Sequence, residues 1–100
     1  MLTIHSENQV MTAELSGELD HHRCAVMRQK IDMLTEQEKP RVLMLDFSGV
    51  QFMDSSGIGL VMGRYRQMSL IGGRLKVINI PPHLQKLFRL SGLGALGVLE

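Results

Sequence analysis

A polar run that joins a buried strand to a helix constrains the fold of this chain more than any other feature. The strand is the continuously apolar segment 42–45, which is typical of a central strand covered on both faces. The helix spans about 58–68, where apolar residues recur three and four positions apart. The run between them ends in Asp54-Ser55-Ser56-Gly57-Ile58-Gly59. In an open α/β sheet, such a junction lies at the edge where ligands and partners bind.

The first twenty residues predict a β-hairpin ahead of this junction. Residues 2–5 and 11–15 alternate apolar and polar side chains, and the polar segment 7–9 separates them. Two such strands joined by a short polar turn favour antiparallel pairing. Ser16-Gly17 is expected to end the second strand.

Three helices are predicted from stripes of apolar residues. The first begins at the capping residue Asp20 and ends at Pro40, and the third begins at Pro82, since proline suits a first helical position. In the second helix, Arg64, Arg66 and Gln67 are placed on the solvent face, where the two arginines could also pair with an acidic partner. The buried stripes are expected to be Cys24, Met27, Ile31 and Leu34, then Ile58, Val61, Met62, Tyr65 and Met68, then Leu84, Leu87 and Phe88.

The order of these elements predicts an α/β fold. Gly49 is expected to mark a turn, the segment 74–80 to form a strand, and the segment 97–99 to be a candidate for a last short strand. Strands that alternate with helices imply right-handed crossovers and a mostly parallel sheet. We therefore expect four to five strands, an antiparallel edge strand from the hairpin, and flanking helices.

The amino-acid composition limits the classes of function that this chain can have. The 100 residues are expected to form one domain, and 44% hydrophobic with 21% charged residues argues against disorder. The net charge of +1 gives no strong electrostatic attraction to nucleic acid. Only 4% of the residues are aromatic, so the chain offers no surface on which bases could stack. The single Cys24 excludes an internal disulfide, and no apolar run approaches a membrane span or a signal peptide. We expect a cytoplasmic protein that binds neither nucleic acid nor membranes.

The polar run has two interpretations, which are compatible. Asp54 and the two serines are good residues for the start of a helix. Ser55 is also a candidate phosphoacceptor, because a helix start tolerates the roughly −1.5 to −2 charges of a phosphate. Gly57 and Gly59 weaken a helix but leave bare backbone that a partner can approach. Asp20 lies after another strand, so it is expected to cap its helix, to form a second acidic side of one docking surface, or to do both.

Catalytic and metal sites fit the sequence less well. The glycines of segment 57–63 lack the spacing of a dinucleotide-binding loop, and the chain has no P-loop. A nucleophile elbow requires a glycine two positions before the serine, and neither Ser55 nor Ser56 has one. The segment 21–24, His-His-Arg-Cys, is better explained by a core cysteine beside exposed histidines than by a zinc site. We expect no enzymatic activity and no cofactor, with a small nucleotide-binding or hydrolytic protein as the alternative.

Three segments together resemble a STAS domain, and most closely the anti-sigma factor antagonists of the sporulation sigma F pathway. They are Gly17-Glu18-Leu19-Asp20-His21-His22, residues 46–59, and Gly63-Arg64-Tyr65. The resemblance covers nearly the whole chain and implies a regulatory protein whose unphosphorylated form binds an anti-sigma factor and frees the sigma factor. It implies that this anti-sigma factor is also a serine kinase that phosphorylates Ser55, and that a PP2C-type phosphatase reverses the modification.

The same resemblance implies a docking surface made of Asp20, Asp54, Ser56, Gly57 and Ile58. It also implies a further C-terminal helix, which this chain lacks, so we expect a less well covered last strand. A general-stress-response homologue that acts on another sigma factor is the alternative within the family.

Overall fold

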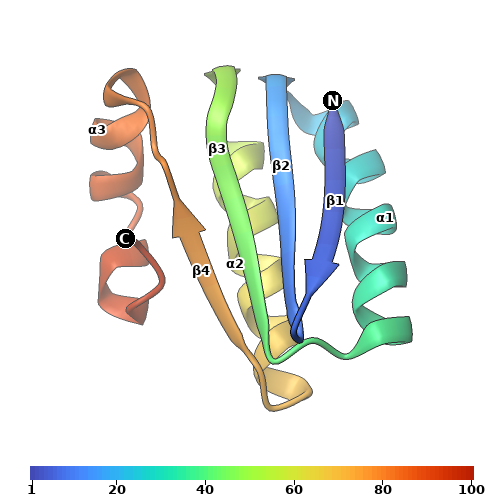
Figure 1. Ribbon diagram of the computed structural model, residues 1–100. Helices are drawn as coiled ribbons and strands as arrows, with labels where there is room; N and C mark the ends of the chain where they lie inside the picture. Colours follow the sequence, from blue (N-terminus) through green and yellow to red (C-terminus); the bar gives the residue numbers. More distant parts are fainter.

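The computed structural model describes residues 1–100 as a four-stranded sheet with three helices (Figure 1). The strands lie in the order β1-β2-β3-β4, with β1 and β2 antiparallel and the other pairs parallel. This confirms the predicted fold class. The elements are β1 (Leu2–Glu7), β2 (Val10–Leu19), α1 (His21–Glu38), β3 (Val42–Met53), α2 (Ser55–Leu70), β4 (Arg74–Ile78), α3 (Pro82–Leu90) and the 3-10 turn η1 (Leu93–Leu96).

Helices α1 and α2 both lie behind the sheet in Figure 1, whereas α3 and η1 lie beside the edge strand β4. The two crossovers step across the sheet in one direction, from β2 to β3 and then to β4. Right-handed crossovers that step in one direction place their helices on the same face. Burial therefore alternates along Val42–Phe47 between buried and half-buried residues, and the prediction of a strand covered on both faces is wrong.

The hairpin is confirmed, but its second strand is longer than predicted. The turn consists of Asn8 and Gln9, which both have positive φ, as a tight two-residue hairpin turn requires. Ser16-Gly17 does not end β2, which continues to Leu19. Gly17 instead has φ +84° and lies where the register against β3 shifts. A glycine inside a strand pattern marked a bulge here and not a turn.

Gly49 likewise lies inside β3 and not in a turn, so this prediction was wrong too. It pairs with Ser16, and a Cβ atom at Gly49 would lie 2.9 Å from the Cβ of Ser16. Between the pairs Glu14–Asp46 and Leu19–Met53, β2 advances five residues (14 to 19) and β3 seven (46 to 53). The β3 strand thus carries two more residues than β2 over this stretch. The backbones of β2 and β3 approach closely at Gly49, which explains why this position is a glycine.

The helices cover the sheet much as their apolar stripes predict, with two exceptions on α2. Met62 is 43% exposed, although we expected it in the core. Arg64, expected in solvent, is buried with 6% of its surface exposed, because α1 packs against this side of α2. In α1, Leu34 is only half-buried and Thr35 takes the last buried position. No helix of the chain is both long enough and apolar enough to span a bilayer.

The last residues cover the outer edge of β4 without forming a full strand. The predicted strand at 97–99 is reduced to one parallel bridge between Val77 and Leu99. The Val77 N–H donates to the Val98 carbonyl at 2.7 Å, and the Val77 carbonyl accepts from Glu100 N–H at 3.0 Å. Leu93 and Val98 are buried in the core cluster. The edge of β4 is therefore partly paired within the described chain.

Candidate functional site

Two helices begin side by side at the carboxyl edge of the sheet, at the top of Figure 1. Leu19 at the end of β2 pairs with Met53 at the end of β3, and the next residues are Asp20 and Asp54. The Asp54 N–H donates to the Leu19 carbonyl at 3.4 Å, which ties the two junctions together. The sequence-predicted residues of both junctions thus lie at one edge of the molecule.

Asp54 caps α2 and leaves Ser55 exposed. Its Oδ1 accepts a hydrogen bond from Ser56 N–H at 2.8 Å, and its carbonyl accepts from Gly57 N–H at 3.0 Å. Ser55 is the first residue of α2 and is exposed, whereas Ser56 is half-buried. Because the carboxylate of Asp54 makes the capping bond, the cap does not require the Ser55 hydroxyl.

Asp20 caps α1 in the same way and also holds an arginine. Its Oδ1 accepts from Arg23 N–H at 2.8 Å, and its Oδ2 accepts from Arg23 Nη1 at 2.8 Å. Glu18 accepts a weaker bond from the same Nη1 at 3.3 Å. The hydrogen bond from the Arg23 backbone is the main cause that lowers the pKa of Asp20, and the Arg23 charge adds to it. A carboxylate therefore stands at the start of each of the two helices.

The three residues that follow the serines differ in their surroundings. Gly57 is buried, and a Cβ atom there would overlap Cγ and Sδ of Met53, so packing inside the protein requires this glycine. Ile58 is half-buried against the core. Gly59 is exposed, and a Cβ atom on it would meet only open space. Gly59 is thus the glycine that presents bare backbone to solvent.

Phe52 is a feature of this edge that the sequence analysis missed. It is 55% exposed and lies two residues before Asp54. Beside it, the carbonyl of Gln51 contacts His83 Nε2 of α3 at 3.0 Å, so the start of α3 reaches the same edge. The sequence did not reveal it, because the two extra residues of β3 interrupt the alternation, and Val50, which is also at an odd spacing from Phe47, is buried.

The histidines of segment 21–24 and Cys24 are not arranged as a metal site. His21 and His22 are exposed, and Cys24 is buried. No group of three or more His, Cys, Asp or Glu side chains in the chain is arranged to hold a metal ion. The structure places Cys24 in the core stripe of α1, as the sequence predicts.

We expect Cys24 to be unreactive in the native protein. Burial raises the pKa of its thiol to about 11, and the carboxylates of Asp54 and Asp20 add to this effect. Compared with the ordinary pKa of 9.0, this leaves about a hundredfold less thiolate near neutral pH. The rate of labelling by iodoacetamide at pH 8, native against urea-unfolded, measures the effect. Equal rates in the two states would contradict it.

Comparison with known proteins identifies the family. The model of the STAS domain matches residues 2–97. The anti-sigma F factor antagonist of Lysinibacillus sphaericus is 38% identical over 96 residues, which cover 91% of this chain and 82% of that protein. The solved structure of the anti-sigma factor antagonist SpoIIAA in its unphosphorylated form has a TM-score of 0.88 and 34% identity, covering 100% of this chain and 86% of that chain.

The structure of the Bacillus cell fate determinant SpoIIAA in the phosphorylated form also matches, with a TM-score of 0.80 and 34% identity, covering 100% of this chain and 89% of that chain. The same fold is thus known with and without phosphate on a relative. From the family model, the identity and the shared fold, the chain belongs to the STAS-domain family of anti-sigma factor antagonists.

Proposed function

We propose that this protein is an anti-sigma factor antagonist controlled by phosphorylation of Ser55. Its unphosphorylated form binds an anti-sigma factor that is also a serine kinase, and this binding releases the sigma factor. A PP2C-type phosphatase restores the binding form in the cytoplasm. The observation that carries the proposal is the exposed Ser55 at the first position of α2, on a chain 38% identical to an anti-sigma F factor antagonist.

The docking surface that we propose surrounds Ser55 at the carboxyl edge of the sheet. It consists of Asp20, Asp54, Ser56, Gly57, Ile58 and Gly59. Gly57 is buried and supports this surface from beneath, because the absence of a side chain leaves room for Met53. Phe52 extends this surface with an exposed aromatic ring, and aromatic residues are enriched among the hot spots of protein interfaces.

The electrostatics of the edge favour a switch that acts on the partner and not on the fold. A phosphate on Ser55 would add roughly −1.5 to −2 charges beside two carboxylates. The positive end of the α2 dipole partly offsets this charge within the protein. An incoming protein gains no such offset, so its acidic groups are repelled and its contact with Ser55 is sterically blocked. The role that follows is regulatory and not catalytic.

Ser55→Asp is expected to weaken binding to the anti-sigma factor by about tenfold or more, because like charges at an interface are unfavourable. Its thermal unfolding midpoint should stay close to that of the original protein, because aspartate is tolerated at the first turn of a helix. Isothermal titration calorimetry and circular dichroism measure the two quantities. Ser55→Ala is the matched control and should bind normally. Equal affinities of the two variants would contradict the proposal.

A further inference from the structure

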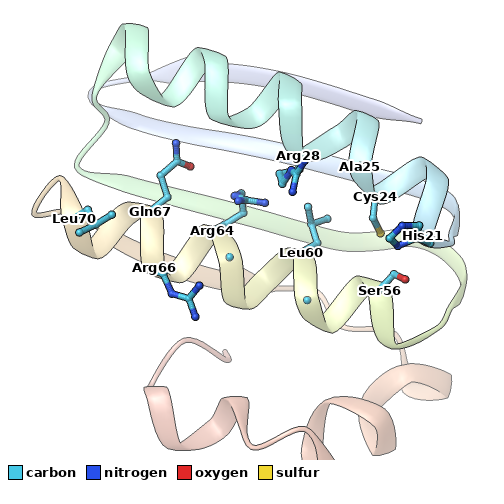
Figure 2. A pocket seen from close by; sticks show the side chains of 12 residues that line it. His21, Cys24, Ala25, Arg28, Ser56, Leu60, Arg64, Arg66, Gln67 and Leu70 are labelled. Atoms are coloured by element: carbon cyan, nitrogen blue, oxygen red, sulfur yellow. The ribbon is translucent and has the colours of Figure 1, made fainter.

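A groove runs between α1 and α2, behind the sheet. It has a volume of about 510 Å³ and extends from His21 and Ser56 at one end to Leu70 at the other (Figure 2). Arg28 of α1 and Arg64 of α2 both line it, and no acidic side chain does. The groove is therefore positive in character.

Arg64 is the key residue of this groove, because its charge is buried and only partly paired. Its side chain is 7% exposed, and Nε lies 2.8 Å from Oδ1 of Asp32. Nε and Nη1 are both buried without a hydrogen bond of good geometry, so the contact with Asp32 is an ion pair only. Figure 2 shows the guanidinium extending from α2 toward α1 and the side chain of Arg28. A buried charged donor without an acceptor is unfavourable, so this geometry suits an added anion.

Two carboxylates lie near the two arginines. Asp32 faces Arg64, and Glu36 lines the adjoining hollow together with Asp32, Arg28 and Arg64. Burial raises the pKa of Asp32, and the charge of Glu36 raises it as well. Burial lowers the pKa of Arg64, and the Arg28 charge lowers it further. What Arg64 lacks is a hydrogen-bond acceptor, and an oxyanion between the two arginines would supply one.

Gln67 adds a feature that discriminates between oxyanions. Its Oε1 is buried without a donor, and Figure 2 shows its side chain rising toward α1 beside Arg64. A ligand that both accepts from Arg64 and donates to Gln67 would satisfy both groups. A monoprotonated phosphate group does both, whereas sulfate at neutral pH only accepts. Gly59 and Gly63 keep the adjacent surface of α2 low, since a Cβ atom on either would meet only open space.

We propose that this groove binds a monoprotonated phosphate group, held by Arg64 and Arg28, with the oxygen of Gln67 accepting its proton. The group is either inorganic phosphate or the phosphate of a small phosphomonoester. Ser55 does not line the groove, although Ser56 and Gly59 of the docking surface lie at one end of it.

Titration of the intact protein at pH 7 and constant ionic strength tests the site by NMR. Inorganic phosphate should shift the Arg64 Nε–H and Gln67 side-chain amide signals saturably, and sulfate should bind at least about tenfold more weakly. A titration with glycerol 3-phosphate distinguishes a phosphomonoester ligand from inorganic phosphate. Tighter binding than phosphate identifies a phosphomonoester ligand, and equal or weaker binding identifies inorganic phosphate. Non-saturable shifts, or identical responses to phosphate, sulfate and chloride, would overturn the proposal.

Variants give a second test. Arg28→Gln changes an exposed residue and should weaken phosphate binding by about tenfold or more. Arg89→Gln, an exposed arginine on α3, is the control and should leave the affinity unchanged. Gln67→Met should reduce the preference for phosphate over sulfate. Arg64→Met should abolish binding, and if this buried substitution prevents folding, Arg28→Gln decides. Equal affinities for Arg28→Gln and Arg89→Gln would rule the site out.

Discussion

Incubation of this protein with its cognate anti-sigma kinase and ATP is expected to add one phosphate, at Ser55, and Ser55→Ala is expected to abolish the labelling. The reason is the division of roles at the start of α2. Asp54 makes the capping bond to Ser56 N–H, so Ser55 stays exposed at the first helical position. Intact mass and peptide mapping by mass spectrometry measure the number of phosphates and their position.

The matched control is Ser56→Ala. Ser56 is half-buried and lines the groove between α1 and α2, so its hydroxyl is less accessible to a kinase. This variant should still accept one phosphate. Phosphate found on Ser56, or labelling that persists in Ser55→Ala, would show that Ser55 is not the acceptor.

Phe47→Ala is expected to lower the free energy of unfolding by about 3–5 kcal/mol. Phe47 is 0% exposed, and its ring packs edge-to-face against Phe88 of α3 with centroids 5.1 Å apart. Truncation removes this contact and leaves a cavity between the sheet and α3. Since native proteins are stable by about 5–15 kcal/mol in total, the loss is a large share. Urea denaturation followed by circular dichroism measures it.

Phe52→Ala is the paired control, because it removes the same ring from the same strand on the opposite face. Phe52 is 55% exposed, so the free energy of unfolding should change by less than about 0.5 kcal/mol. Binding to the anti-sigma factor should weaken by about tenfold or more if Phe52 is an anchor of the docking surface. Two variants of equal stability would contradict the assignment of the two faces of β3.

The sequence predicts best what depends on neighbouring residues. Asp20 and Asp54 cap their helices because a carboxylate reaches an N–H group only two or three positions away. The hairpin follows from alternation on both sides of a polar turn. The shared edge of the two junctions follows from parallel pairing, since Leu19 and Met53 must then end together.

The features that the sequence does not predict depend on contacts between distant segments. Gly49 breaks a strand pattern locally, and only the pairing with Ser16 shows that it lies in a bulge. Arg64 is a charged residue of the kind that usually faces solvent. It is buried only because α1 packs against α2 and places Asp32 opposite it. The groove between these helices is likewise formed by side chains that are far apart in sequence. Hydrophobic periodicity within one helix carries no information about its neighbour.

The two extra residues of β3 have a consequence for how this strand tolerates change in length. Each one reverses which side chains face inward, and together they restore the original alternation, so that Met53 points inward and Phe52 outward. Deleting one residue between Asp46 and Phe52 would exchange those two side chains. Homologous chains should therefore gain or lose residues in this stretch in pairs.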